Sequence, residues 1–431
     1  MTDQPLNLPE SPAPRPVRAT PRSAPRFVAT EAAGEKRRGF LGTLDSTLLV
    51  IVGVLLAIGL MMVYSTTFDW SYQTYGNQST IFLQHLRNAL IGAALMIILT
   101  FVDYRIWRRL AVIILLMTIG ALVAVLLFGD DTFGARRALI NGSFQPGELA
   151  ELTIVVYMAA WLSSRRMQVR SLTNGLLPFA VLVSIVSGLV LLQPDISTAA
   201  TILVVGSIMF FLAGADLVHM SVAGVLVAVV GVIWVTNFGP DYAQGRLDSY
   251  LNSVTDVTQA DYHVQQAIIA FSNGGLTGLG LGQGKQKFAN LPAPHTDSIF
   301  AVIGEELGLL GATLVVALYV ALVVRGLRLA RRAVDNFGAL LVAGLTIWIA
   351  LKALLNIAVM TAMVPPTGAP LPFISFGGSS LVVLMSATGL MLSVGRVRAL
   401  EGLPKRATVE RRNVLAYLKP NREDGQERES V

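Results

Sequence analysis

Long apolar runs alternate with short polar or charged stretches along most of the chain, and this pattern predicts its architecture. Each run is close to the ~20 residues that an α-helix needs to cross a bilayer. We therefore expect an all-α, polytopic integral membrane protein with about ten transmembrane helices. The approximate predicted spans are Ser46–Tyr64, Leu83–Phe101, Trp107–Phe128, Glu148–Leu162, Leu172–Leu192, Ser197–Ala213, Leu217–Phe238, Ser298–Val324, Phe337–Met363 and Ser379–Val394.

The two ends of the chain lack this pattern. Residues 1–39 are rich in Pro, Ala, Arg and Ser and contain no apolar core. This composition is typical of a disordered tail rather than a secretory signal. We expect a tail at 1–39, a membrane domain at 40–398 and a charged tail at 399–431. One loop, at 239–296, is too long for a simple connection, and loops of that size tend to be functional.

The composition excludes several classes of site. The chain is 53% hydrophobic and only 14% charged, whereas soluble domains are about a quarter charged. It has no cysteine, which excludes disulfides, thiol nucleophiles and Cys-based zinc sites. No two of its four histidines have metal-ligand spacing, so we expect neither zinc nor haem. The net charge of +6 does not require a nucleic-acid partner, since membrane proteins concentrate Lys and Arg on the cytoplasmic side.

The distribution of Lys and Arg predicts the orientation. The loop after the first span has neither residue, while the turns after the second, fourth and eighth spans carry clusters of arginine. This alternation places both termini in the cytoplasm. The basic residues that then fall outside are Arg136, Arg137, Arg246, Lys285 and Lys287. They are either ordinary exceptions to a bias or the clamps of an outward site that binds a polyanion.

The stretch from Gly274 to Gly311 is the strongest candidate for an active site. It begins as a glycine-rich loop with two lysines, reaches Asp297, and enters an apolar helix that carries Glu305 and Glu306. Glycines let a backbone approach a ligand closely, but their spacing here fits neither nucleotide-binding motif, so no nucleotide is expected. Asp297 is a candidate general base with cations nearby; the plain alternative is that it is the N-cap of the eighth span, and the two roles can coexist.

Other polar features interrupt the spans. Buried acids such as Glu305 and Glu306, counted about 12 Å into the membrane at ~1.5 Å per residue, should line a cavity or pair with a cation. Lys352 raises the same question. The stretch Val364–Ser380 has four prolines and three glycines, which forbid a helix and suggest a structured rim to the same cavity. We expect Asp195 to be a helix cap rather than a ligand.

Four separated motifs support a family resemblance. They are QPGELAEL at 145–152, QPDIST at 193–198, HTDSIFAVIGEELGLLG at 295–311 and PLPFISFGGSS at 370–380. Over about residues 44–398 the chain resembles the SEDS family of peptidoglycan glycosyltransferases, which includes FtsW, RodA and SpoVE. The PLPF sequence, with Phe373, and the long N-terminal tail are more similar to the division member FtsW than to RodA.

The resemblance implies polymerisation of lipid II on the outer face of the cytoplasmic membrane, for cell division or cell shape, with undecaprenyl pyrophosphate as the leaving group. It assigns the essential aspartate to Asp297, the outer-loop arginine to Arg246 and the first acidic motif residue to Glu148. Partners would be a class b penicillin-binding protein transpeptidase and other division or elongation proteins. A divalent cation, Mg or Mn, could share the pyrophosphate charge. Further candidate substrate-binding residues are Lys285, Lys287, Arg137, Ser375 and Ser379.

Two other function classes fit the same spans. A lipid II flippase would also use helix breaks and buried charges, and a non-catalytic scaffold for division proteins would need neither. A polymerase should bring Asp297 and Arg246 to one outer cavity, whereas a flippase needs a polar path through both leaflets.

The chain departs from the family pattern at five positions, which are Glu151 for Lys, Ser197 for Gly, Ser298 for Phe, Lys352 for Gln and Phe376 for Tyr. The first and fourth of these look like a cation moved from one helix to another, so we predict that Lys352 pairs with Glu151. Depth counted along the spans favours Glu305 or Glu306 as the partner instead.

Overall fold

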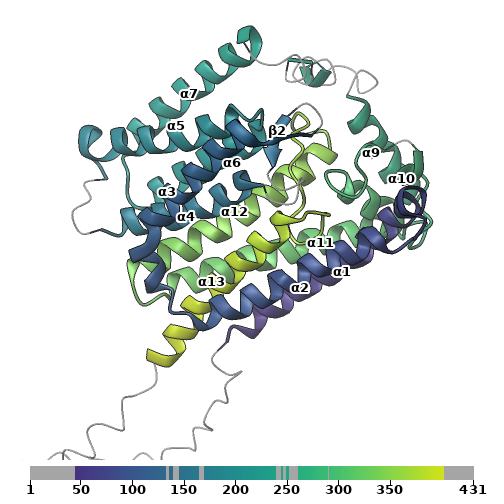
Figure 1. Cartoon of the computed structure of the whole chain (residues 1–431), viewed down its shortest axis with the longest axis horizontal. Helices are drawn as coiled ribbons and strands as arrows, with labels where there is room; N and C mark the ends of the chain where they lie inside the picture. The colour runs from purple at the N-terminus through teal and green to yellow at the C-terminus, as the bar shows by residue number, and fades with distance from the viewer. Residues whose placement is uncertain are drawn as a thin grey trace, which may run out of the picture. The chain divides into compact units, whose positions relative to one another are not determined.

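The structure, a computed structural model, describes residues 44–132, 135–138, 145–164, 169–238, 244–245, 249–251, 261–289 and 291–401. The predicted tail at 1–39, nearly all of the predicted tail at 399–431, and Arg246 lie outside these ranges, as do the side chains of Arg136 and Arg137. The elements (Figure 1) are α1 (Ser46–Tyr75), α2 (Thr80–Phe101), α3 (Arg105–Phe128), β1 (Asp130–Thr132), β2 (Ala135–Ala138), α4 (Pro146–Leu162), η2 (Leu172–Leu176), α5 (Leu177–Leu191), α6 (Ile196–Leu212), α7 (Leu217–Phe238), α9 (Tyr262–Gly274), α10 (Gln286–Ala289), α11 (Ile299–Arg331), α12 (Asn336–Met360) and α13 (Ser379–Glu401).

Each predicted span overlaps a described helix over most of its length, so the all-α, polytopic membrane architecture is confirmed. Within the described ranges, seven helices are long and apolar enough to cross a bilayer: α1, α2, α3, η2 with α5, α11, α12 and α13. The apolar helix α6 and the helix α4 are shorter, at 17 residues each. Outside the helices, β1 and β2 form an antiparallel hairpin that the sequence did not predict.

Helices α1 and α11 both continue beyond the apolar runs that predicted them. α1 was expected to end at Tyr64 but continues to Tyr75, where Gly76 terminates it in a left-handed conformation with φ 69°. Its 30 residues span about 45 Å at ~1.5 Å per residue, and the hydrocarbon core is only ~30 Å thick. α11 has 33 residues and also exceeds that thickness, so both helices present polar turns outside the core.

Aspartates fix where several helices begin. Asp45 caps α1 by accepting from the Leu48 amide at 3.1 Å, and Asp335 caps α12 by accepting from the Gly338 amide at 2.7 Å. Asp195 caps α6, accepting from the amide of Thr198 at 3.1 Å, as predicted. Each carboxylate satisfies a first-turn amide that has no partner within its own helix.

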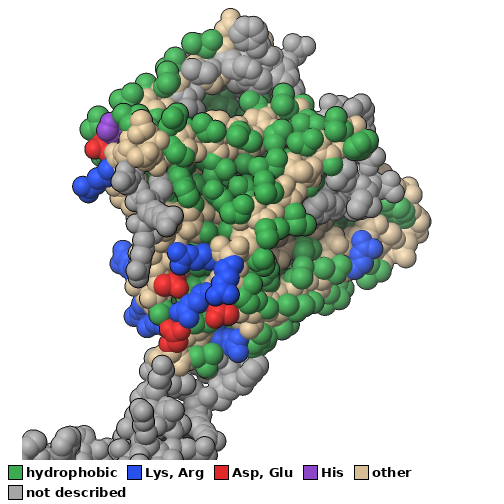
Figure 2. All heavy atoms as spheres, turned by 60° about the vertical axis from the view of Figure 1, so that its left-hand side comes forward, with side chains coloured by type: hydrophobic (Ala, Val, Ile, Leu, Met, Phe, Trp, Pro, Cys, Tyr) green, Lys and Arg blue, Asp and Glu red, His purple; other side chains and the backbone are tan. Residues whose placement is uncertain are grey.

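Helix α13 lies in the interior of the bundle, and α2 and α3 lie at its surface. In the apolar 18-residue stretch of α13, 78% of the residues are buried, whereas 28% are buried in the corresponding stretches of α2 and α3. Figure 2 shows hydrophobic side chains covering the side of the bundle, with Lys and Arg gathered near one end of it. That end includes Arg105, Arg325 and Arg396, and we call it the arginine end. The opposite end carries Asp297, and we call it the Asp297 end.

Helix α11 is broken at Gly308, which has φ 67° and ψ −168°. A break in a helix leaves amides and carbonyls without intrahelical partners. The loop that follows α9 supplies those partners: the carbonyls of Glu305 and Glu306 accept from the amides of Leu279 and Gly280 at 3.0 Å each. On the other side of the break, the Leu309 amide donates to the Gly275 carbonyl at 2.9 Å. The break and the loop are therefore one structural unit.

Close backbone contact in this unit predicts that alanine destabilises the protein more at one of two glycines with similar φ than at the other. Gly278 has φ 81° and Gly282 has φ 80°, so alanine at either position costs about 1–2 kcal/mol of left-handed strain. A Cβ at Gly278 would lie 2.1 Å from the Glu306 carbonyl oxygen, while one at Gly282 meets nothing within 4 Å. We expect Gly278→Ala to cost a further 1–3 kcal/mol, roughly, through overpacking.

The measurement is the melting temperature of each purified variant in detergent. Gly282→Ala is the matched control for backbone strain, and Gly278→Ala should melt several degrees below it. Equal melting temperatures would mean that the loop does not pack against the break as described.

Candidate functional site

The turn that carries Asp297 leads directly into α11. The N-cap position of α11 is occupied by Ser298, whose side chain makes no capping hydrogen bond. Asp297 is therefore the residue that directly precedes the N-cap position. Its side chain is half-buried, so it is a carboxylate at a loop–helix boundary.

The non-helical segment between α12 and α13 holds this turn through main-chain oxygens. The Asn356 side-chain amide on α12 donates to the carbonyl of Asp297 and to that of Ala369, both at 2.8 Å. The Ser375 hydroxyl donates to the Thr296 carbonyl at 2.6 Å. These bonds fasten the backbone of the Asp297 turn to the segment and to α12 at once.

The same segment forms a wall beside the Asp297 carboxylate. Gly368 has φ 73°, and a Cβ built there would lie 3.3 Å from Oδ2 of Asp297. The segment is therefore a structured element packed on the turn, as its composition predicted. The hydroxyl of Ser375, a predicted substrate-binding residue, lies within this wall, where it also accepts from the Leu371 amide at 2.7 Å.

Aromatic rings surround His295, two residues before Asp297. Its imidazole stacks on Trp70 with the ring centroids 4.6 Å apart, and Phe376 approaches it edge-on at 5.7 Å. The Phe376 amide donates to the His295 carbonyl at 2.8 Å. Burial lowers the pKa of His295 to about 4, so this imidazole is neutral near pH 7 and fixes the turn by packing rather than by charge.

Lys352 pairs with Glu151, which confirms the sequence prediction. The Nζ atom of Lys352 lies 2.7 Å from Oε2 of Glu151, and both side chains are buried. One turn earlier on α4, Glu148 accepts from the Ser379 hydroxyl at 2.6 Å. Because Lys352 is one helical turn from Asn356, the ion pair lies directly below the contacts that hold the Asp297 turn.

Glu305 and Glu306 are not partners of Lys352, so the alternative based on depth is wrong. Glu306 pairs with Lys287 at 2.6 Å, and the same Lys287 ammonium donates to the hydroxyl of Ser65 at 2.8 Å. Glu305 accepts from the backbone amides of Lys285 at 3.1 Å and Gln286 at 3.2 Å. Both glutamates bind the glycine-rich loop.

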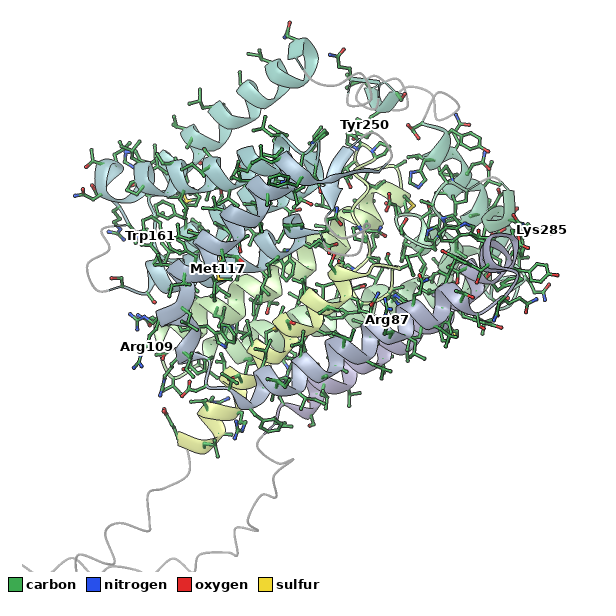
Figure 3. The ribbon with its side chains drawn as sticks, viewed as in Figure 1. Arg87, Arg109, Met117, Trp161, Tyr250 and Lys285 are labelled. Atoms are coloured by element: carbon green, nitrogen blue, oxygen red, sulfur yellow. The ribbon has the colours of Figure 1, made fainter. Side chains whose placement is uncertain are left out.

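These contacts correct the interpretation of the glycine-rich loop. The sequence suggested that its glycines bring backbone close to a ligand and that Lys287 clamps a phosphate. In the structure the glycines bring backbone close to α11, and a Cβ at Gly284 would lie 2.9 Å from Oε2 of Glu305. The Lys287 ammonium is buried against Glu306. Lys285, in contrast, is exposed, as Figure 3 shows near α10.

Two predicted site residues cannot be placed in this geometry, and three residues that contribute to it were not predicted. Arg246 lies outside the described residues, and Arg137 is described only as backbone in β2. Sequence reasoning gave no role to Asn356 and did not single out Ser65 or Trp70. A polar amide one turn from a lysine within an apolar span was the available signal for Asn356.

The ion pair between α4 and α12 predicts the outcome of a charge swap. Glu151→Lys alone places two buried cations together and should cost on the order of 3–5 kcal/mol, as removal of a buried partner does. Glu151→Lys combined with Lys352→Gln moves the cation to α4 and should recover most of that loss. The stability of both variants is measured by melting temperature and yield in detergent. Lys352→Gln alone is the remaining variant of the double-mutant cycle. Equal behaviour of the single Glu151→Lys variant and the double variant would contradict the pairing.

Comparisons with known proteins agree with the resemblance in the motifs. The family model of FtsW, RodA and SpoVE, described as cell cycle protein, matches residues 46–399. The probable peptidoglycan glycosyltransferase FtsW of Trichlorobacter lovleyi is 36% identical over 82% of this chain and 93% of its own length. The stage V sporulation protein E of Bacillus subtilis is 35% identical over 82% of this chain and 97% of its own.

Solved structures share the fold. A chain from a peptidoglycan synthase complex, studied for its coordination of polymerization and crosslinking, superposes with a TM-score of 0.68 at 26% identity, covering 82% of this chain and 98% of that one. The rod shape determining protein RodA of Thermus thermophilus gives a TM-score of 0.61 at 25% identity, with coverage of 82% and 97%. The helical membrane fold, the Asp297 turn and these matches lead to one conclusion: the chain belongs to the FtsW/RodA/SpoVE family.

Proposed function

We propose that this protein is a peptidoglycan glycosyltransferase that polymerises lipid II into glycan strands for cell division or cell shape. The observation that carries the proposal is the Asp297 turn, a half-buried carboxylate whose backbone is fixed from two sides by Asn356 and Ser375. A general base must be held in place relative to its substrate. The family relatives named as glycosyltransferases supply the reaction class.

Asp297 is the proposed general base. The acceptor sugar hydroxyl is a weak nucleophile, and the carboxylate takes its proton as the oxygen bonds to the anomeric carbon. The bond between that carbon and the pyrophosphate breaks, and the pyrophosphate leaves with the electron pair. Arg246 is the proposed stabiliser of this developing negative charge. Lys287 is removed from that role because its ammonium is occupied by Glu306.

We propose that the Asp297 end faces the outside of the cytoplasmic membrane and that both termini are cytoplasmic. Support comes from the arginine end, where Arg105, Arg325 and Arg396 accompany the turns between spans. Positive charge concentrates on the cytoplasmic side of membrane proteins. Lipid II would then present its sugars at the Asp297 turn while its acyl chains stay in the bilayer.

The position of the buried charges favours a polymerase over a flippase. Lys352 lies one turn from Asn356, which contacts the Asp297 turn, and Glu306 lies about 28 Å along α11 from Arg325 at ~1.5 Å per residue. Among the described residues, the spans bury no charged side chain between the levels of Lys352 and Glu306 and the arginine end. A carrier needs a polar path through both halves. The buried charged residues are Glu148, Glu151, Lys287, Glu305, Glu306 and Lys352.

We propose two further associations for the same protein. A class b penicillin-binding protein transpeptidase would crosslink the strand as it is made, since a structural relative comes from a complex that coordinates polymerization with crosslinking. A divalent cation, Mg or Mn, would travel with the pyrophosphate. Among the described residues, no three His, Asp or Glu side chains lie close enough together to hold a metal ion by themselves.

The first test of this function is Asp297→Asn, which keeps the shape of the side chain and removes the base. We expect polymer formation from purified lipid II to fall by about 10²–10⁴, the usual contribution of a general base, with no change in melting temperature. The matched control is Asp69→Asn at the same end, where the carboxylate accepts from Gln73. Polymerisation by Asp297→Asn at the rate of the control would remove Asp297 as the base.

The second test concerns the charge on Arg246. Arg246→Ala removes the proposed clamp and should lower turnover of lipid II by about 10²–10³, as loss of one transition-state donor does. Arg246→Lys keeps a cation without the bidentate fork and should retain part of the activity. The same polymerisation assay measures both, and equal loss in the two variants would argue against an electrostatic role.

A further inference from the structure

Two polar contacts between α1 and α11 mark the limits of the hydrocarbon core. At the arginine end, Arg325 of α11 binds Asp45 at 2.9 Å. At the Asp297 end, Ser65 of α1 donates to Glu306 at 2.8 Å. The intervening lengths are about 30 Å on α1 and about 28 Å on α11 at ~1.5 Å per residue. Both agree with a hydrocarbon thickness of ~30 Å, so the Ser65–Glu306 contact lies at the boundary of the core.

This assignment corrects the depth expected for Glu305 and Glu306. Counting from the predicted start of the span placed them about 12 Å inside the membrane at ~1.5 Å per residue. The Arg325–Asp45 and Ser65–Glu306 contacts, about 28–30 Å apart along the helices at ~1.5 Å per residue, instead place the two glutamates at the core boundary. A boundary position also accounts for the concentration of ion pairs and backbone contacts around them, because water and headgroups reduce the cost of placing charge there.

The loop after α9 reaches below this boundary. Residues 275–285, which we call the tip segment, begin beside the turn of α11 that follows Glu306. The Leu310 amide donates to the carbonyl of Leu276 at 3.2 Å. Leu310 lies one turn from Glu306 toward the core, about 6 Å at ~1.5 Å per residue. The tip segment therefore dips into the outermost layer of hydrocarbon on the Asp297 side.

The side chains of the tip segment suit that position. Leu276 is 68% exposed and Leu281 is 50% exposed, and Leu310 beside them on α11 is 65% exposed. Leu279 is also exposed. Apolar side chains that project from a fixed backbone at the level of the acyl-chain boundary gain favourable burial when lipid covers them. The backbone groups that would be costly in lipid are already bonded to α11.

A single exposed cation lies at the upper end of the tip segment. The Lys285 side chain is exposed, while its amide donates to Glu305 at 3.1 Å, which fixes its backbone at the core boundary. Figure 3 shows Lys285 beside α10, at the opposite end of the bundle from Arg109. An ammonium at the level of the headgroups, next to leucines at the level of the acyl chains, is complementary to an anionic phospholipid.

We propose that the tip segment is an interfacial membrane anchor that binds anionic phospholipid: Leu276, Leu279 and Leu281 insert among the acyl chains of the leaflet at the Asp297 end, and Lys285 binds the lipid phosphate. The anchor keeps the loop, and with it the broken part of α11, at a constant height in the membrane. The proposal rests on the contacts of α1, α11 and the loop and does not depend on the reaction at Asp297.

Site-directed labelling tests the insertion, because the chain has no native cysteine. Leu279→Cys and Leu281→Cys, each labelled with bimane, are reconstituted in vesicles that contain phosphatidylcholine with brominated acyl chains. The lipid control is Met117→Cys on the exposed face of α3 (Figure 3), and the water control is Gln78→Cys in the exposed turn after α1. We expect both tip labels to show at least half the quenching of the Met117 label. Quenching no greater than that of the Gln78 label would overturn the insertion.

The phosphate contact is tested by lipid preference. In vesicles of phosphatidylcholine and phosphatidylglycerol, energy transfer from a label at Leu281→Cys to a fluorescent phosphatidylglycerol reports enrichment of the anionic lipid at the tip. Lys285→Gln should reduce that enrichment up to about fivefold, which corresponds to about 1 kcal/mol for one lysine near an anionic surface, and Lys285→Arg should retain it. Unchanged enrichment, or a loss confined to lipid II affinity, would assign the lysine to another role and overturn the proposal.

Discussion

The break in α11 at Gly308 is the constraint on which much of the Asp297 end depends. Hydrocarbon offers no partner to an amide or carbonyl released by a broken helix. Here the released groups bond to the loop after α9, and the carboxylates of Glu305 and Glu306 bind further amides of the same loop. Helix α1 joins this unit through Ser65 and Lys287. One local break thereby determines the course of a loop that is distant from it in sequence.

The Asp297 turn is positioned by a separate set of contacts, and nearly all of them act on backbone. Asn356 and Ser375 donate to carbonyls of Asp297 and Thr296, and the amide of Phe376 donates to that of His295. Side chains of α12 and of the segment after it therefore set the height and direction of the turn. These backbone contacts place the Asp297 carboxylate at a defined position on the turn.

The sequence was sufficient for the spans because a bilayer enforces long apolar runs. For Lys352 it required a carboxylate partner but offered two: the departures from the family pattern indicated Glu151, and depth indicated Glu305 or Glu306. The structure decided between them, and the sequence was also insufficient where a contact joins residues far apart in the chain. Lys287 resembled a phosphate clamp because nothing in its neighbourhood of the chain indicates a contact with Ser65, far away in α1. The extension of α1 to Tyr75 was also missed, since a helix that leaves the membrane no longer shows the apolar pattern used to find it.

The contacts of the structure also account for the departures from the family pattern. Ser197 donates to the carbonyl of Thr367, within the wall beside Asp297, so a residue larger than glycine is accommodated by a new bond. Phe376 uses its amide on His295 and packs its ring on His85 and His295, neither of which needs a tyrosine hydroxyl. Ser298 contacts the imidazole of His263 on α9, which ties the start of α11 to its neighbour. Each of these three departures from the family pattern is therefore accommodated by a local contact. The hydrogen bonds from Asn356 and Ser375 to the backbone of the Asp297 turn do not involve these three side chains.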